Sequence, residues 1–301
     1  MCTAFTLRRR DGTQLFGRTL DWHESFGERI LRTPAGLALG TGRGEASPFP
    51  DALPRVTRYV MLGMGAEMGF PLYADGFNER GLCMAGLRFA KGAHYWPPGA
   101  KKSDGILDLA PWEVIPCVLG LCTDVGEAKK LLSRVRVVNL PYRSPSGERI
   151  PTSPLHWMIA DRETSLVVEA TVRGLEMYGA PLGVMTNDPP YAEQMAAYER
   201  FLQGEEGKAL PDDYTSTARF IRATHLKKEA EDRLACGSED AVTCFFSVAG
   251  AVSPPEGATP AITGKGWQTT RYTCCMDGVR GRYFYTTAEH PQVREISLVL
   301  S

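Results

Sequence analysis

Short β-type segments and amphipathic helices alternate in blocks along the chain, and this order restricts the possible folds more than any other feature. Runs rich in β-branched and aromatic residues open the chain, return in its middle and close it. Apolar residues at helical spacing fill the stretches between those runs. The order predicts an α+β fold in which two largely antiparallel sheets stack face to face, with helices on their outer faces.

The predicted elements follow one another without a repeat, a linker or a low-complexity stretch, so we expect a single domain over residues 1–301. Strands are expected at residues 2–7, 15–20, 26–31, 56–63, 71–75, 82–87, 155–160, 165–171, 175–178, 183–186, 269–276, 282–287 and 295–299. Helices are expected at residues 108–122, 125–134, 191–202, 217–234 and 239–249.

Cys2 is a candidate nucleophile because of its position. A small residue after Met1 allows removal of Met1, so we expect the mature chain to begin at Cys2. A terminal cysteine has a thiol and a free α-amine on the same Cα, and an amine with an ordinary pKa of about 7.7–8.0 can accept a proton from a thiol of about 8.5. One residue then supplies both nucleophile and base. A hairpin turn at Gly12 would bring Arg18 and Asp21, at or just past the end of the returning strand, beside Cys2.

Charge and hydropathy exclude several classes of partner. The net charge is −1 with a pI near 6.5, and the basic residues do not gather into a stripe, which argues against nucleic acid as a partner. The longest nearly apolar stretch, residues 241–252, is too short to cross a bilayer. The N-terminus has no apolar segment typical of a signal peptide. We therefore expect a soluble, cytoplasmic protein without a membrane partner.

The cysteines do not form a metal-binding or disulfide pattern. None of the eight belongs to a C-x-x-C pair, and the five histidines do not stand beside them at zinc-ligand spacing. Most are surrounded by apolar residues, where a free thiol behaves as a small hydrophobic group. We expect no metal and no other cofactor.

A series of motifs, in order along the chain, resembles those of one enzyme family. They lie at residues 1–3 (MCT), 15–21 (LFGRTLD), 60–65 (VMLGMG), 73–82 (YADGFNERGL), 155–158 (LHWM), 183–189 (GVMTNDP), 216–222 (STARFIR) and 272–276 (YTCCM). They resemble the choloylglycine hydrolases, a family that contains the conjugated bile salt hydrolases and the penicillin V acylases. The resemblance covers nearly the whole chain and implies an N-terminal nucleophile hydrolase with a four-layer αββα fold.

The resemblance also implies a set of catalytic residues. Cys2 would attack an amide carbonyl to form a thioester, and its own amine would move the proton. Arg18 would lie beside Cys2, where a cation favours the thiolate, and the Asp21 carboxylate would accept a hydrogen bond from the amine. Asn187 would donate to the oxyanion, and Arg219 would be a buried electrostatic member of the site. From the residues alone, the two arginines could be solvated, and Asp21 and Asn187 could be turn residues.

Three further polar residues have structural roles as alternatives to functional ones. His156 lies in an apolar strand, so we expect a core histidine with a backbone partner rather than a base. His23, close to Asp21, is a less favoured candidate for the pocket wall. Arg222 shares a helix face with Arg219 and is expected to be structural.

Arg88 departs from the family pattern. In residues 84–89 (MAGLRF), bile salt hydrolases typically have asparagine at this position, and some penicillin V acylases have tyrosine. Arg88 could donate to the oxyanion, pair with Asp21, or bind the anionic end of a substrate. The stretch from residue 202 to 213 is also shorter than in typical members, where it contributes to tetramer contacts in some of them. We expect a homo-oligomer, with a tetramer as one candidate.

The resemblance implies a small, amphipathic amide as the substrate. The preferred candidate is a glycine- or taurine-conjugated bile salt, and its steroid could contact an apolar pocket built from Trp22, Phe26, Phe89 and Trp96. The first alternative is penicillin V acylase or a related N-acyl amide acylase that uses the same cysteine. An alternative of another class is a protein that binds an amphipathic ligand without cleaving it. Retention of the catalytic set as a whole counts against the last of these.

Overall fold

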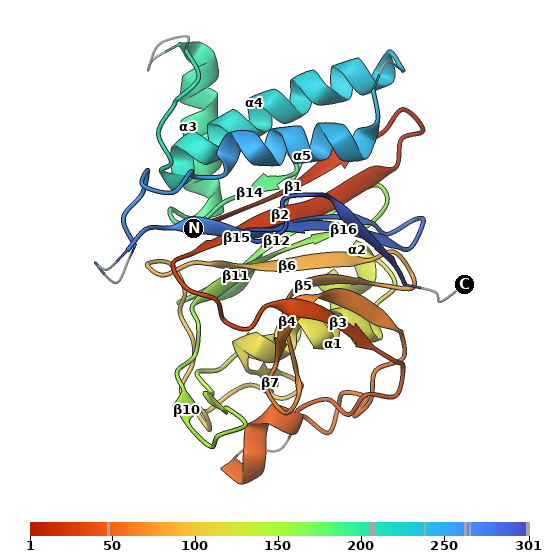
Figure 1. The fold of residues 1–301 in the computed structure, drawn as a ribbon. Coiled ribbons are helices and arrows are strands. Elements are labelled where there is room, and N and C mark those ends of the chain that lie inside the picture. Colours follow the sequence, from red (N-terminus) through yellow and green to blue (C-terminus); the bar gives the residue numbers. More distant parts are fainter. Residues whose placement is uncertain (47–48, 205–208, 238, 262–263, 265, 299–301) are drawn as a thin grey trace.

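Two antiparallel sheets lie face to face at the centre of the protein (Figure 1). The computed structural model describes residues 1–46, 49–204, 209–237, 239–261, 264 and 266–298. The first sheet has the order β14 (Val184–Met185), β1 (Cys2–Arg8), β2 (Gln14–Trp22), β15 (Thr269–Asp277), β16 (Arg282–Thr287) and β17 (Arg294–Ser297). The second has the order β13 (Gly174–Gly179), β12 (Ser165–Thr171), β11 (Leu155–Ala160), β6 (Cys83–Arg88), β5 (Pro71–Asn78), β4 (Met61–Glu67) and β3 (Arg29–Thr33).

Helices cover the outer face of each sheet. The first sheet is covered by α3 (Tyr191–Gln203), α4 (Ser216–Ala235) and α5 (Ala241–Val252), seen at the top of Figure 1. The second is covered by α1 (Val114–Leu121) and α2 (Val125–Leu132). The remaining short elements are η1 (Thr41–Ala46), β7 (Leu107–Leu109), η2 (Pro111–Glu113), β8 (Val135–Val137), β9 (Tyr142–Arg143) and β10 (Arg149–Ile150). The predicted four-layer αββα sandwich is confirmed.

β1 lies at the centre of this sandwich and is buried on both faces. Every residue from Cys2 to Leu7 is buried, because the helices cover one face of the strand and the second sheet covers the other. A strand covered on both faces need not alternate between apolar and polar residues. Gly12, with φ of 82°, makes the turn into β2. Gly17 lets β2 and β15 come together, because a Cβ there would lie 2.0 Å from the carbonyl oxygen of Cys274.

Several predicted boundaries were wrong. The helix expected at 108–122 is shorter and begins only at Val114, because Leu107–Leu109 pairs with Val135–Val137 as a parallel strand and Pro111 disfavours a helical residue before it. The strand expected at 56–63 is β4, which begins at Met61 and ends at Glu67. Within it, Gly63 approaches β5 so closely that only glycine fits. β2 is longer than predicted, so Arg18 and Asp21 lie inside it.

Other predictions differ by a few residues. The strand expected at 26–31 is β3, and β5 continues to Asn78, past the expected end at residue 75. β8, β9 and β10 were not predicted, since each has only two or three residues. The strand expected at 295–299 is β17, and residue 299 lies outside the described residues. No helix in the described part of the chain is long and apolar enough to span a membrane.

Candidate active site

The start of β1, the end of β2 and the segment after β14 meet at one end of the first sheet. Cys2 lies opposite Leu20 in the antiparallel pair of β1 and β2. The Asp21 backbone N–H donates to the carbonyl oxygen of Met1 at 2.9 Å. On the other side of β1, Met185 pairs with Ala4, which places Asn187 beside the chain start. Three segments far apart in the sequence therefore converge on Cys2.

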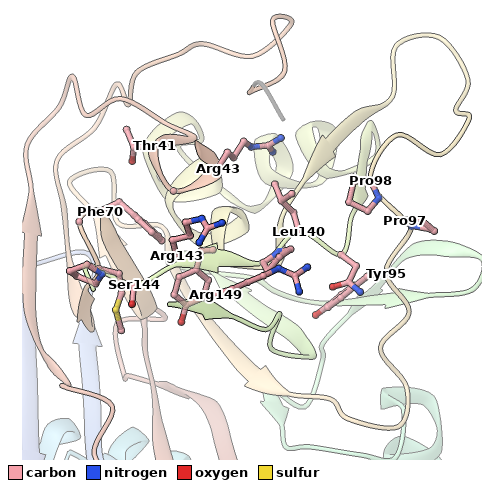
Figure 2. Close-up of a pocket in the computed structure, with 17 residues that line it drawn as sticks. Thr41, Arg43, Phe70, Tyr95, Pro97, Pro98, Leu140, Arg143, Ser144 and Arg149 are labelled. Carbon is pink, nitrogen blue, oxygen red and sulfur yellow. The ribbon is translucent and has the colours of Figure 1, made fainter. Parts of the chain in front are cut away.

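A cavity of about 460 Å³ lies against Cys2, which retains 6% of its surface exposed. Arg18, Asp21 and Arg88 contribute the charged part of its wall. Its apolar wall consists of Leu20, Trp22, Phe26, Met68, Leu72, Trp112, Tyr142 and Leu155. A larger cavity of about 790 Å³ shares Met68 and Tyr142 with it but does not reach Cys2 (Figure 2). We call the smaller of these two the reaction cavity, because Cys2 lines it and could react there.

Asn187 and Arg219 hold the backbone of Cys2. The Cys2 N–H donates to Oδ1 of Asn187 at 2.7 Å, and Nη2 of Arg219 donates to the same oxygen at 2.8 Å. Nη1 of Arg219 donates to the carbonyl oxygen of Cys2 and, at 2.7 Å, to Oγ1 of Thr3. Two donors on Oδ1 fix the orientation of the Asn187 amide, whose Nδ2 donates one hydrogen to the Arg88 carbonyl oxygen at 2.8 Å. Its second hydrogen has no partner among the described residues.

Arg18 extends from β2 across the space between the two sheets. Its Nη1 donates to the carbonyl oxygen of Gly86 on β6 at 2.7 Å, while Nη2 is buried without a partner among the described residues. Burial alone would lower the pKa of Arg18, but the acidic side chains of Cys2, Tyr272 and Asp75 raise it above its ordinary value. The guanidinium is therefore a permanent buried cation at the cavity wall.

Asp75 was part of a motif but was assigned no role from the sequence. Its carboxylate is fully buried between the sheets and accepts hydrogen bonds from the hydroxyls of Tyr272 and Tyr283. Burial raises the pKa of Asp75, and the nearby Arg18 opposes this shift. Asp75 thus adds a polar group, held by two tyrosines, to the space between the sheets that Arg18 crosses.

Asp21 lies at the other side of Cys2. Oδ1 accepts a hydrogen bond from Oγ1 of Thr270 at 2.7 Å, and Oδ2 is buried with no partner in the described part of the chain. Burial raises the pKa of Asp21, against the lowering effect of the Met1 amine and Arg219. The Met1 amine donates to the backbone carbonyl of Asp21 at 2.7 Å rather than to the carboxylate. After removal of Met1, the free amine would be that of Cys2, one residue further along the chain. The predicted contact between this amine and the Asp21 carboxylate therefore stays a prediction.

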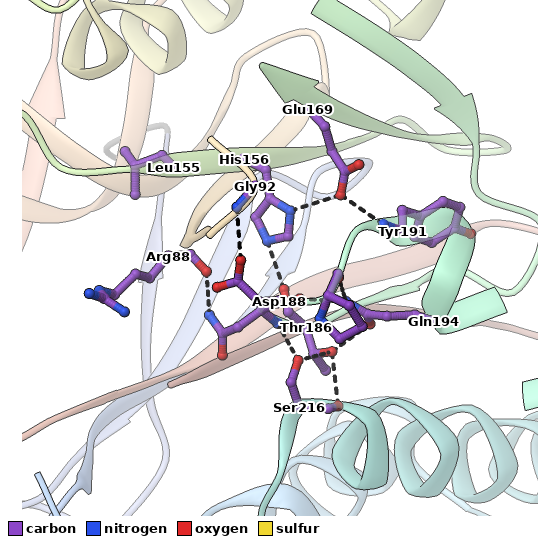
Figure 3. A network of polar contacts seen from close by, with 12 residues as sticks. Arg88, Gly92, Leu155, His156, Glu169, Thr186, Asp188, Tyr191, Gln194 and Ser216 are labelled. Carbon is purple, nitrogen blue, oxygen red and sulfur yellow. Dashed lines mark hydrogen bonds and ion pairs between the residues drawn. The ribbon is translucent and has the colours of Figure 1, made fainter. Parts of the chain in front are cut away.

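Arg88 lines two cavities and does not pair with Asp21. It lies between the reaction cavity and a much smaller cavity of about 110 Å³, which is also lined by Met1, Asn187, Asp188, Ser216 and Arg219. Its side chain points away from the neighbouring polar network in Figure 3, and its guanidinium has no hydrogen bond or ion pair with any described residue. Of the alternatives weighed from the sequence, pairing with Asp21 is wrong.

A buried network supports the Asn187 segment (Figure 3). His156 donates from Nε2 to the carbonyl oxygen of Thr186 at 2.8 Å, and its Nδ1 lies 3.2 Å from Glu169. Gln194 on α3 donates to the carbonyl oxygens of Asn187 and, at 2.8 Å, Pro189. The prediction of a core histidine with a backbone partner is confirmed for His156. Together these bonds fix the backbone on both sides of Asn187.

Two of the aromatic residues expected in the pocket line it, and two do not. Trp22 and Phe26 contribute to the wall. Phe89 is fully buried and stacks on His156 with ring centroids 4.5 Å apart, because its side chain faces the network rather than the cavity. Trp96 packs against the guanidinium of Arg136, which lies 5.4 Å from the Trp96 ring centroid. Trp96 does not line the reaction cavity.

Two other polar residues were also placed by the structure. His23 lines a separate surface cavity with Trp267. Arg222 donates to the backbone carbonyls of Ala251, Pro211 and Asp213, which agrees with a structural role. Within the described residues, no three His, Cys, Asp or Glu side chains form a group that could hold a metal ion.

Much of the cavity wall was missed by the sequence analysis. Met68, Trp112, Tyr142 and residues 151–154 reach it from loops and short elements on the side of the second sheet, whereas Leu72 and Leu155 stand near the starts of β5 and β11. Apolar residues in such positions have no periodic signal, and only their aromatic and proline content distinguishes them. Thr270 could have been suspected only from its neighbour, the 272–276 motif.

Comparisons with known proteins agree with this geometry. The model of the linear amide C–N hydrolases, choloylglycine hydrolase family, matches residues 2–301. A bile salt hydrolase/transferase of Lactiplantibacillus plantarum is 32% identical over 321 residues, which cover 99% of this chain and 92% of the relative. A bile salt hydrolase/transferase of Clostridium perfringens is 29% identical, with the same shares covered.

Solved structures agree as well. The structure of the C2A variant of conjugated bile acid hydrolase from Clostridium perfringens matches with a TM-score of 0.86 at 29% identity, over 99% of this chain and 92% of that one. Penicillin V acylase from Agrobacterium tumefaciens matches in fold, with a TM-score of 0.78 at 23% identity over 98% and 86% of the two chains. The chain is thus a hydrolase of linear amide C–N bonds and belongs to the choloylglycine hydrolase family.

Proposed function

We propose that the protein cleaves the amide bond of glycine- or taurine-conjugated bile salts, with Cys2 as the nucleophile. The observation that supports this most is that Cys2 lines one of two unlike cavities, which share Met1 and Arg88 in their walls. The reaction cavity, lined by Cys2, has a mostly apolar wall. The 110 Å³ cavity beyond Met1 and Arg88 is lined by the polar residues Arg88, Asn187, Asp188, Ser216 and Arg219. A conjugated bile salt has the same division, with an apolar acyl group on one side of the amide and a small anionic amino acid on the other. The names of the relatives point to the same substrate class.

Removal of Met1 would prepare the nucleophile. Met1 lines both cavities, so its loss would free space between them at the sulfur of Cys2. The Cys2 nitrogen would become an α-amine at a position where the backbone N–H already bonds to Asn187. Oδ2 of Asp21, buried and unpaired among the described residues, would be a second acceptor nearby. These two acceptors would orient the amine toward the thiol of the same residue.

The reaction would then proceed in two halves. The amine takes the thiol proton, the sulfur attacks the amide carbon, and the carbonyl oxygen becomes an oxyanion. The unused N–H of Asn187 is a donor for that oxyanion. The protonated amine gives its proton to the leaving nitrogen, the C–N bond breaks, and a thioester remains. Water activated by the same amine attacks the thioester and releases the free acid and the thiol.

The substrate panel that tests this proposal is glycocholate, taurocholate and penicillin V, measured side by side. We expect the highest kcat/KM for one of the two bile salts. A penicillin V acylase is related at 23% identity, so faster cleavage of penicillin V would replace the bile salt assignment by an acylase. Stoichiometric binding of glycocholate with no release of glycine would instead favour the non-catalytic binder.

Arg88→Asn should weaken the binding of anionic substrates. A guanidinium without a partner, beside the small polar cavity, can form a charge-assisted pair with the carboxylate or sulfonate of the leaving group. Loss of such a pair corresponds to a rise in KM of roughly 10- to 100-fold. KM and kcat for glycocholate and for its neutral primary amide would be compared in both enzymes, with the neutral amide as the control. Equal losses on the two substrates would mean that Arg88 only holds the site together.

A further inference from the structure

A second cavity, whose lining residues are drawn in Figure 2, lies beside the reaction cavity and is not lined by Cys2. Its volume is about 790 Å³, and it shares the side chains of Met68 and Tyr142 with the reaction cavity. The boundary between the two is an aromatic cluster. Phe70 lines the second cavity, and its ring centroid lies 4.9 Å from that of Trp112, which lines the first. The two cavities are therefore consecutive along the wall of the protein.

The second cavity is positively charged. Arg143 on β9 and Arg149 on β10 both line it, and they lie directly opposite each other in the β9–β10 hairpin. Like charges that face each other across a strand pair destabilise the pair unless something neutralises them. Arg43, which also lines the cavity, already pairs with Glu113. No carboxylate is among the described residues that form the lining.

Both arginines have N–H donors that form no hydrogen bond among the described residues. Arg143 donates from Nη1 to the carbonyl oxygen of Gly147 at 2.9 Å, which leaves its other N–H groups without a partner among the described residues. Arg149 forms no hydrogen bond or ion pair through its side chain with any described residue. Around them the wall is mostly apolar, with Phe70, Leu140 and Pro98 labelled in Figure 2. An apolar cavity with a cationic edge fits an amphipathic anion.

We propose that this cavity binds the far end of an acyl group that has a negative charge remote from the scissile amide, such as a sulfate ester on a rigid apolar skeleton. The inference rests on the proposed function in one respect, namely that the acyl group occupies the reaction cavity. A long, rigid acyl group that continued past Tyr142 would bring its far end to Arg143 and Arg149, which line the second cavity. The preferred ligands are then doubly anionic, with Arg88 near one end and this arginine pair near the other.

Equilibrium binding separates this inference from the hydrolysis itself. Isothermal titration calorimetry would compare lithocholate with lithocholate 3-sulfate, two steroid acids that have no amide to cleave. We expect the wild-type protein to bind the sulfate ester about tenfold more tightly. The variant with both Arg143→Gln and Arg149→Gln should lose that preference, and Arg149→Gln alone should lose part of it. Arg32→Gln, an exposed strand arginine outside both cavities, is the matched control and should keep it.

Equal wild-type affinity for the two steroids overturns the inference, as does a preference that survives the double variant. If the double variant loses affinity for both steroids, the single variant Arg149→Gln decides the question. The inference requires Arg149→Gln to weaken binding of the sulfate ester alone. Glycine release from glycolithocholate is measured separately on the wild-type protein. Absence of hydrolysis together with arginine-dependent binding of the sulfate ester would refute the proposed function and leave the subsite in place.

Discussion

Cys2→Ser is expected to lower kcat for a conjugated bile salt by roughly 10²–10⁴-fold, the range in which matched acid–base chemistry contributes to catalysis. A serine hydroxyl is a far weaker acid than a thiol, so a base as mild as an α-amine activates it poorly. The substitution leaves the surroundings nearly unchanged. The bonds to Asn187 and Arg219 come from the backbone of residue 2 and would be retained.

The melting temperature of Cys2→Ser should stay within a few degrees of the wild-type value, since the side chains have similar size and only one buried atom changes. Cys236→Ser is the matched control, because Cys236 is a free and exposed cysteine at the end of α4 and does not line the reaction cavity or the 110 Å³ cavity. It should retain full activity. Near-wild-type turnover in Cys2→Ser would show that Cys2 is not the nucleophile.

The same preparations test the removal of Met1 by intact-mass measurement. The mechanism requires that the active wild-type protein be lighter by one methionine, because a backbone amide on Cys2 cannot act as a base. Full activity in protein that retains Met1 would contradict the mechanism while leaving the family assignment untouched.

The layers of the fold followed from the sequence because strand and helix signals were separated into blocks. β11 (Leu155–Ala160) and β12 (Ser165–Thr171) match their predicted ranges, since both are central strands of apolar residues bounded by clear turns. The weakest predictions concerned residues 107–113, where a short strand and a turn precede the helix. There the helical spacing of apolar residues continued through a segment that Pro111 and pairing with β8 keep extended.

The candidate site was predictable only where motifs marked it. Cys2, Arg18, Asp21, Asn187 and Arg219 are separated by up to 217 positions in the chain, and the structure brings them around one point. No periodicity in the sequence reports such long-range proximity, and here it came from the resemblance. Phe89 shows the limit of that reasoning. It directly follows Arg88, yet alternation along the chain turns it into the core against His156.

Asn187→Ala is expected to lower kcat by roughly 10²–10³-fold, corresponding to about 2.7–4 kcal/mol for one oxyanion donor. Two different roles would each produce a loss. Nδ2 has an unused hydrogen that could reach the oxyanion, whereas Oδ1 accepts from the Cys2 nitrogen and from Arg219 and so positions both. Alanine removes both functions, and therefore cannot separate them.

Asn187→Asp separates the two roles, because aspartate keeps the acceptor oxygen toward Cys2 and Arg219 but has no N–H to donate. If Asn187 stabilises the oxyanion, kcat in Asn187→Asp falls at least as far as in Asn187→Ala, since a carboxylate would also repel the developing charge. If Asn187 only positions the amine, aspartate recovers most of the activity that alanine loses. Ser216→Ala serves as the control for backbone position, because the Ser216 hydroxyl accepts the Asn187 N–H at 2.8 Å without reaching Cys2. A small loss in Ser216→Ala, combined with equally large losses in the two Asn187 variants, would assign the donor role to the amide.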